Sequence, residues 1–278
     1  MKLNRLKNHI LAGLVGATCL APLAHAGSQL LPGISTGLAM GAAMPPGLYS
    51  ISLVNYGWRG NQPNVGMLAP TWIVWSTPWT IAGGRFIVDT VTAVADVRVH
   101  GSRHYTGAGN PLLDAQLKWD LGNGLSAGVQ SGVYVPLKSS LTALGVTRDF
   151  YSFQEVAAVT YEHNNWEFDA TGIYGTGRHG TQLGVNAAPA WVNYDFTVFK
   201  RIAGWELGAL AFGSNDISTP VVNYEKQSQF ALGLLVGYKI GPTVLQLKLS
   251  RDVAQTGYGA RETRAWVNWI VPVSALFQ

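Results

Sequence analysis

Ionisable side chains fall on alternate positions of several otherwise apolar segments, and they are the residues best able to interact with a ligand through charge and hydrogen bonds. Between residues 112 and 121, Asp114 and Lys118 alternate with leucine, alanine and tryptophan. In an extended chain such charges share one face, opposite the apolar side chains. The set predicted to lie on this polar face comprises Asp114, Lys118, Glu167, Asp169, Asp195, Glu206, Lys248 and Arg264.

These charges allow two compatible interpretations. Because an unpaired buried charge is costly, the residues can form paired contacts that fill a confined interior. They can also line a polar constriction that selects solutes by charge and by hydrogen-bonding groups. Aromatic residues on the same face would give a solute path an apolar side for a ring-shaped molecule, or would simply pack the interior. They are Tyr134, Trp191, Phe199 and Phe212.

The histidines form no recognisable catalytic or metal-binding arrangement. His163 precedes Asn164 in a predicted polar turn, and His100 and His104 fall in a predicted loop, where a four-residue spacing fixes no ligand geometry. Charges in the loops are expected to keep the rim of the molecule hydrated. We therefore predict no enzyme activity, no catalytic residues, no metal site and no cofactor.

Composition restricts the fold that positions these residues. Of 278 residues, 47% are hydrophobic and only 12% are charged, which excludes a disordered chain and a coiled coil. Outside the N-terminus, no apolar run reaches the roughly 18 residues of a transmembrane helix. The classes that remain are a soluble all-β protein and a membrane-spanning β-barrel.

Residues 1–26 have the features of a secretory signal peptide. Three basic residues precede an apolar stretch from Ile10 to Leu20, and an Ala-His-Ala sequence ends at the expected cleavage site, Ala26. Removal takes away the single cysteine, Cys19, so neither a disulfide nor a thiolate site is expected. It also removes three of the 19 basic residues and leaves a net charge of about +1, so nucleic acid is not a predicted partner.

Residues 27–46 differ in character from the rest of the chain. They are rich in glycine, alanine and leucine and are too apolar for a free periplasmic tail. They could fold into the lumen of a barrel as a plug, or form a short helix on its rim, and the sequence leaves both alternatives open. The barrel itself is assigned to residues 47–278.

Alternation with a period of two predicts about twelve strands. The clearest pattern runs from Leu113 to Leu121, where apolar and polar residues alternate without exception. The predicted strands cover approximately residues 47–58, 67–76, 82–99, 112–121, 124–137, 149–162, 166–174, 190–198, 204–214, 230–238, 245–250 and 267–273.

The predicted connections alternate in length. The short series is Ser76–Trp79, Gly122–Gly124, His163–Asn165, Ala203–Gly204 and Gly241–Pro242. The long series is 57–66, 100–109, 138–148, 178–189, 214–227 and 253–261. This layout is typical of an antiparallel, transmembrane β-barrel of the Gram-negative outer-membrane type. Tryptophans near strand ends, including Trp72, Trp75 and Trp79, favour interfacial girdles over a secreted β-sandwich.

Three short stretches resemble a known family of outer-membrane barrels. They are Pro45-Pro46-Gly47-Leu48-Tyr49, the Gly-Asn-Pro-Leu-Leu-Asp sequence that ends at Asp114, and the Gly241-Pro242 turn. Over roughly residues 45–273 the chain is similar to the family named for the meta-pathway of phenol degradation. The resemblance implies a Gram-negative outer-membrane barrel that passes small apolar or aromatic compounds.

The sequence thus predicts an outer-membrane channel for passive uptake of small hydrophobic or aromatic compounds, with outer-membrane lipid and the solute as partners. Two other interpretations remain: a structural or adhesive surface barrel that binds a partner through its long loops, and a lipid-modifying enzyme whose site lies at the rim. The sequence does not define the solute or the oligomeric state.

Overall fold

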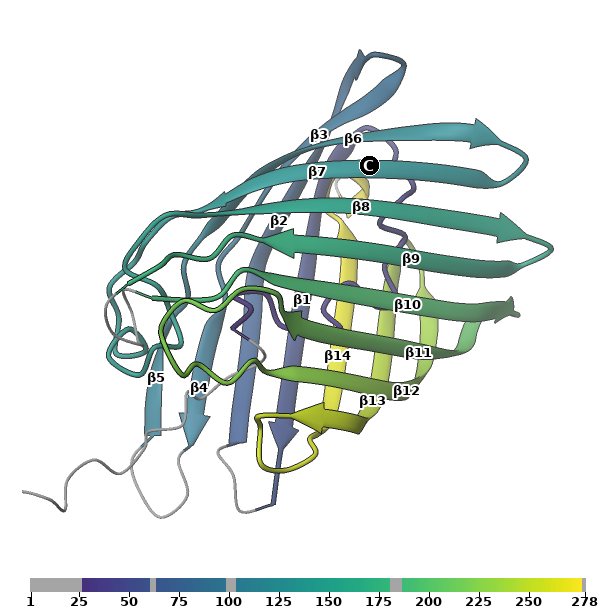
Figure 1. Cartoon of the computed structure of the whole chain (residues 1–278). Coiled ribbons are helices and arrows are strands. Elements are labelled where there is room, and N and C mark those ends of the chain that lie inside the picture. The colour runs from purple at the N-terminus through teal and green to yellow at the C-terminus, as the bar shows by residue number, and fades with distance from the viewer. Residues whose placement is uncertain (1–26, 61–63, 99–103, 181–186, 277–278) are drawn as a thin grey trace, which may run out of the picture.

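The computed structural model describes residues 27–60, 64–98, 104–180 and 187–276. Within these residues, fourteen strand segments form one antiparallel sheet, and β1 pairs with both β2 and β14 to close it (Figure 1). The segments are β1 (Gly47–Trp58), β2 (Asn64–Ile81), β3 (Gly84–Val91), β4 (Val94–Arg98), β5 (His104–Ala108), β6 (Leu112–Gly122), β7 (Leu125–Tyr134), β8 (Ser152–His163), β9 (Trp166–Gly175), β10 (Trp191–Ile202), β11 (Trp205–Asp216), β12 (Ser228–Ile240), β13 (Thr243–Thr256) and β14 (Thr263–Pro272). A short 3₁₀ helix, η1 (Val273–Leu276), follows β14.

In the described part of the chain, the fourteen segments occupy twelve positions around the barrel. β3 and β4 pair with successive parts of β2 and together occupy one position in the wall. β6 pairs with β3 and β5 pairs with β4, so β5 and β6 together occupy the next position. The predicted strand number is therefore confirmed. Several boundaries differ from the prediction. The predicted loop 100–109 contains β5, because β4 and β5 pair from Val94↔Ala108 to Arg98↔His104 and extend the hairpin. The predicted loops 57–66 and 253–261 are also too long, because β2 begins at Asn64 and β13 continues to Thr256.

Burial alternates along the strands as the barrel requires. In β13, Leu247 is 51% exposed whereas the adjacent Lys248 is 3% exposed. The exposed face is apolar and the inner face is polar, which is the pattern of a barrel surrounded by lipid. The strands β1 and β2 differ, because their inward residues Ile51, Leu53 and Val74 are apolar as well. Both faces of these two strands carry apolar side chains, so their sequences show only weak alternation between apolar and polar residues.

Most of the predicted short turns lie at one end of the barrel, and one is misplaced. We predicted a turn at Ser76–Trp79, but β2 continues to Ile81 and the chain turns at Ala82 and Gly83, both with positive φ. A shift in the β2–β3 register between Ser76 and Thr80 lets the strand continue through this stretch.

The tryptophans follow the predicted girdle with one clear exception. Trp75 and Trp79 are exposed on the outer surface and their rings contact edge to face at 5.4 Å. Trp72 is instead buried, and its indole N–H donates to Asp89 at 3.1 Å. Trp72 occupies an inward-facing position of β2, so the prediction that it belongs to the interfacial girdle is wrong.

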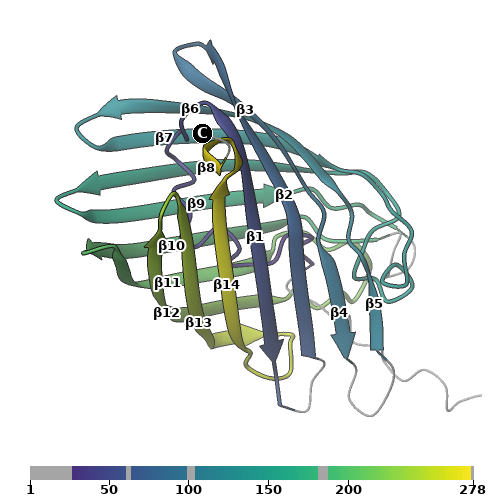
Figure 2. The same ribbon diagram turned by 180° about the vertical axis from the view of Figure 1, so that it is seen from behind.

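The wall is continuous when seen from behind, where β14 lies between β1 and β13 (Figure 2). Residues 27–46 run between the walls before β1 begins at Gly47 (Figures 1 and 2). Within the residues described, no helix combines the length and the apolar character needed to cross a membrane.

Arginine in place of Leu247 tests the outward assignment. The charge would face lipid near mid-height, and we expect the free energy of unfolding in lipid vesicles to fall by about 2–4 kcal/mol. The same substitution at Val253, an outward residue nearer the long-loop end of β13, should cost at most about 1 kcal/mol because the cost decreases toward the interface. If urea titration showed the same loss of unfolding free energy for both variants, this placement of the membrane would be contradicted.

Candidate functional site

The interior of the barrel is crossed by residues 31–41, which we call the interior segment. It contains successive tight turns, in which Ile34 N–H donates to the Leu31 carbonyl at 3.2 Å and Leu38 N–H donates to the Ser35 carbonyl at 3.0 Å. Residues 31–38 are all buried. This segment, rather than a continuous water-filled lumen, occupies the centre of the barrel.

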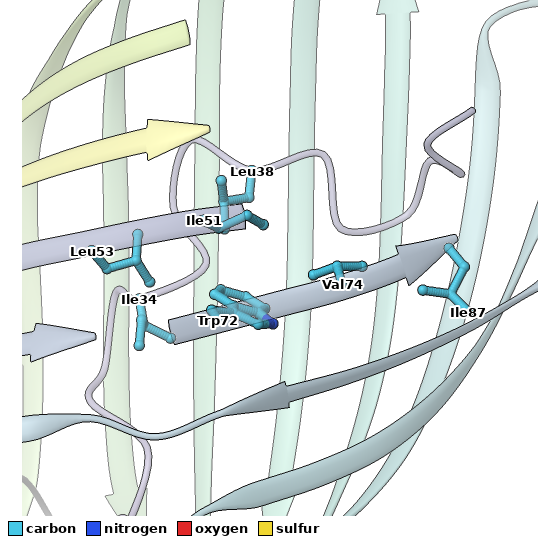
Figure 3. Close-up of a cluster of buried hydrophobic side chains, with 7 residues drawn as sticks. All are labelled: Ile34, Leu38, Ile51, Leu53, Trp72, Val74 and Ile87. Atoms are coloured by element: carbon cyan, nitrogen blue, oxygen red, sulfur yellow. The ribbon is translucent and has the colours of Figure 1, made fainter. Parts of the chain in front are cut away.

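One side of the interior segment is apolar and packs on β1, β2 and β3. Figure 3 shows Ile34 and Leu38 beside inward side chains of these strands. The apolar inner faces of β1 and β2 are thereby covered, and burial of such side chains stabilises the arrangement through the hydrophobic effect. The cluster consists of Ile34, Leu38, Ile51, Leu53, Trp72, Val74 and Ile87.

The opposite side of the segment is polar, and Asp195 of β10 is its principal partner. The Asp195 carboxylate accepts hydrogen bonds from Gly33 N–H and Ser35 N–H, each at 3.0 Å, and from the Ser35 hydroxyl at 2.6 Å. Hydrogen bonds to a carboxylate are stronger than those between neutral groups. Asp195 therefore fixes one turn of the interior segment.

Lys248 of β13 holds the next turn from another strand. Its ammonium group donates to the Thr36 carbonyl at 2.7 Å and to the Thr36 hydroxyl at 2.8 Å. The amide of Asn268 donates to the same carbonyl at 3.4 Å, and Gln246 donates to the Gly37 carbonyl at 2.8 Å. Three inward side chains thus satisfy two consecutive carbonyl groups.

Threonines complete these attachments along the segment. Gly37 N–H donates to the Thr197 hydroxyl at 2.9 Å, and Gly41 N–H donates to the Thr160 hydroxyl at 3.1 Å. Thr160 in turn donates to Asp169 at 2.7 Å. The predicted inward residue Asp169 is therefore connected to the segment through one hydroxyl group.

Two glycines are required by both conformation and space. Gly33 has φ +84° and Gly37 has φ +79°, a region that favours glycine. A Cβ atom at Gly33 would lie 2.6 Å from the Phe212 ring, and one at Gly37 would lie 2.5 Å from the Gln246 side-chain oxygen. The small residues of the segment therefore permit its close approach to the barrel wall.

All eight predicted inward ionisable residues are buried, but they belong to separate clusters. On β6, Asp114 accepts a hydrogen bond from Gln130 at 2.6 Å and another from Gln116 at 3.3 Å. Lys118 is attracted to Asp114 and to Asp89 of β3. The two predicted residues of this wall thus interact with each other and with Asp89, and they lie several strands away along the sheet from Lys248 and Arg264.

A second cluster surrounds Arg201 at the short-turn end of β10. Its guanidinium contacts Glu167, lies 2.8 Å from Glu162 and lies 3.5 Å from Glu206. Glu206 also accepts a hydrogen bond from Gln246 at 2.9 Å. Glu167 and Glu206 were predicted to face inward, and both do so with a cation beside them.

A third cluster lies near the long-loop end, around Arg264 of β14. Arg264 lies 2.7 Å from Glu262 and donates to Asn55, while Arg59 lies 3.2 Å from the second Glu262 oxygen. The Glu262 N–H donates to Asp252 at 2.8 Å. Arg264 therefore ties β14 to β1 and to the neighbouring loop.

Several residues of these clusters were not singled out from the sequence. Arg201 shares the phase of Asp195, and Asp252 shares the phase of Lys248, so strict alternation would have found them. Arg59 and Glu262 lie outside the strands, where alternation gives no information.

The four predicted aromatic residues have different environments. Phe199 and Phe212 pack with Leu31 and Trp266, and Trp191 packs with Val156 and Ile173. These three residues fill the interior. Tyr134 alone among the four borders the larger internal cavity, and its hydroxyl donates to Gln154 at 2.7 Å.

Two apolar cavities remain beside the start of the interior segment. The larger has a volume of about 120 Å³ and lies between residues 28–34, strands β2 and β4, and the loop 135–151. The smaller has a volume of about 30 Å³ and is bordered by Trp72, Leu112 and Ile173. Leu30, Ile34 and Val91 border both cavities, so these side chains separate them.

The loop 135–151 contributes one anchor for the N-terminal residues. Arg148 donates to the Gly27 carbonyl at 3.0 Å. Burial lowers the pKa of the Arg148 guanidinium, whereas the nearby Tyr224 and Asp216 raise it. An arginine remains cationic in spite of such a shift, so the contact persists over the physiological pH range.

Two stretches have the Gly-x-Ser-x-Gly spacing of serine hydrolases, and neither has the required context. Ser35 donates to Asp195 within the interior segment, and Ser126 lies in β7 paired with Thr160. The hydrolase motif needs a turn between a strand and a helix. His104 lies 3.4 Å from Asp96 on exposed strands, while His100 is outside the described residues. Among the described residues, no three His, Cys, Asp or Glu side chains are grouped to hold a metal ion.

The closed sheet, the apolar outer face and the filled interior define a twelve-stranded transmembrane β-barrel of the Gram-negative outer-membrane type. The fold is similar to that of an outer membrane channel from Pseudomonas putida F1, with a TM-score of 0.66 and 14% identity over 84% of this chain and 97% of that chain. The NanC porin gives a TM-score of 0.48 and 9% identity, over 78% and 98% of the two chains. The β domain of the Bordetella autotransporter BrkA gives a TM-score of 0.44 and 15% identity, over 81% of this chain and 99% of that chain.

Residues 62–269 match the model of the family described as "Putative MetA-pathway of phenol degradation". The chain belongs to this family, and the resemblance predicted from the sequence is confirmed. No curated protein sequence matches the chain significantly.

Removing the Asp195 carboxylate should release the interior segment. A single cysteine at Leu38, which is 6% exposed, should react slowly with a maleimide in the protein purified without residues 1–26. Asp195→Ala should accelerate this reaction about tenfold or more, because three hydrogen bonds worth roughly 0.5–1.5 kcal/mol each are lost. Asp120→Ala, a change at an exposed residue near the end of β6, serves as the control. Equal labelling rates in all three backgrounds would show that Asp195 does not retain the segment.

Proposed function

We propose that the protein is an outer-membrane channel for passive uptake of small, uncharged, hydrophobic or aromatic molecules. The observation that carries this proposal is the division of the interior. Hydrogen bonds anchor the interior segment across the lumen, and the larger cavity beside it is lined mainly by apolar side chains. Such a path excludes hydrated ions, because its walls cannot replace their hydration shell.

The charged clusters have a supporting role in this proposal. Asp195 and Lys248 hold the segment, whereas Arg201 and Arg264 are paired with carboxylates near the two ends of the barrel. In this proposal the interior segment forms the constriction, and inward ionisable residues such as Asp195 and Lys248 set its position.

Membership of the family and the fold of the Pseudomonas putida F1 channel agree with this proposal. The apolar outer face and tryptophan-bearing rims suit an outer membrane, into which the chain would insert after removal of residues 1–26. The described histidines and serines give no support to a lipid-modifying enzyme at the rim. No described feature favours an adhesive role for the long loops.

Uptake by intact Gram-negative cells tests the function. Cells that produce the chain should take up radiolabelled acetophenone faster than cells without it, whereas uptake of radiolabelled arabinose, a small hydrated solute, should not change. The apolar path accepts the ketone at little cost but leaves the hydroxyl groups of the sugar without partners. Accelerated uptake of both compounds would indicate a general pore, and acceleration of neither would refute a channel.

A further inference from the structure

We propose that the larger cavity is a binding site for a neutral molecule of about one aromatic ring that carries a hydrogen-bond acceptor, and that the Gln29 side-chain amide donates to this acceptor. This inference rests on the proposed function in that the site would lie on the solute path. It goes further in assigning the position of the site, the size of the ligand and the group that recognises it.

The size and lining of the cavity define the first part of the ligand. Its volume of about 120 Å³ is close to that of an engineered apolar cavity in another protein, about 150 Å³, which binds benzene. Its wall includes Leu31, Met67, Val97 and Leu141, and no lining residue carries an aspartate, glutamate, lysine, arginine or histidine side chain. A charged ligand would therefore lose its hydration without gaining a counter-ion.

The polar atoms of the wall are almost all occupied by protein partners. Ser28 donates to the Leu30 carbonyl at 2.5 Å. Asn110 exchanges hydrogen bonds with the backbone of Arg148 at 2.8 and 3.2 Å. Tyr134 donates to Gln154, as described above. These groups are not free to recognise a ligand.

Gln29 differs from these residues. Its side-chain oxygen accepts a hydrogen bond from Ser152, but its Nε2 atom is shielded from water and has no partner among the described residues. A buried donor without an acceptor is unfavourable, and a ligand oxygen would relieve this cost once the amide turns toward the cavity. Because the terminal torsion of a glutamine side chain is broad, the amide can adjust toward such a ligand.

The second cavity explains why a ligand would stay at this site. At about 30 Å³ it is too small for a ring, and Leu30 and Ile34 lie between the two spaces. A bound molecule can advance only if these side chains, and hence the interior segment, move. The larger cavity is therefore a place where a solute waits before the segment opens.

Two nearly isosteric probes test the assignment. Anisole has an ether oxygen where ethylbenzene has a methylene group. Binding of each compound would be measured by isothermal titration calorimetry to the protein in lipid nanodiscs, with empty nanodiscs as the blank. We expect the parent to bind anisole about two- to tenfold more tightly, the range that one net hydrogen bond gives. In Gln29→Leu this preference should disappear while binding of ethylbenzene is retained.

A cavity-filling variant locates the binding. Ala95→Leu places extra volume in the cavity and should abolish binding of both probes, whereas Ala157→Leu makes the same change on the lipid face and should have no effect. Equal affinity for the two probes in the parent, an unchanged preference in Gln29→Leu, or full binding in Ala95→Leu would each overturn the proposal. The uptake assay tests the channel separately. Specific binding without uptake would refute the proposed channel but not the binding site. Uptake without the preference for anisole would refute the binding site but not the channel.

Discussion

A chain segment inside a closed barrel must find partners for its backbone N–H and C=O groups, and this requirement governs the rest of the structure. Buried backbone groups that lack hydrogen bonds are strongly destabilising. Here the wall supplies the partners: Asp195 accepts from two N–H groups, and Lys248 and Gln246 donate to two carbonyl groups. The same contacts satisfy the buried charges of Asp195 and Lys248, so the segment and this part of the wall stabilise each other.

The two sides of the segment explain an asymmetry in the barrel. Strands β10, β13 and β14 present polar residues to its hydrogen-bonding side, whereas β1 and β2 present apolar residues to Ile34 and Leu38. A lumen filled with water would need polar side chains all round. An amphipathic occupant instead allows β1 and β2 to keep an apolar inner face, and this face continues toward the cavities.

The sequence predicts much of this framework, and its failures have physical causes. Alternation correctly placed Asp195 and Lys248 inside because lipid and lumen impose opposite demands on neighbouring residues. It could not identify Thr36 or Gly33 as their partners, because the interior segment has no repeating pattern and its contacts join positions about 160 to 212 residues apart. The prediction for Trp72 fails because tryptophan is typical of membrane interfaces, whereas the inward–outward alternation of β2 places this residue inside. The predicted turn after β2 lies too early in the chain, because amino-acid composition does not reveal the register shift that lets the strand continue.

On the proposed path, the interior segment must move for a solute to pass. Ser35→Cys and Asp195→Cys would join the segment to the wall at a point where the native side chains are 2.6 Å apart. Uptake of acetophenone would be measured with this pair oxidised to a disulfide and after reduction, in a chain whose only other cysteine lies within residues 1–26. We predict that oxidation lowers uptake to the level of cells without the protein and that reduction restores it. Equal uptake in the two states would contradict the account, because the path would then be open with the segment in place.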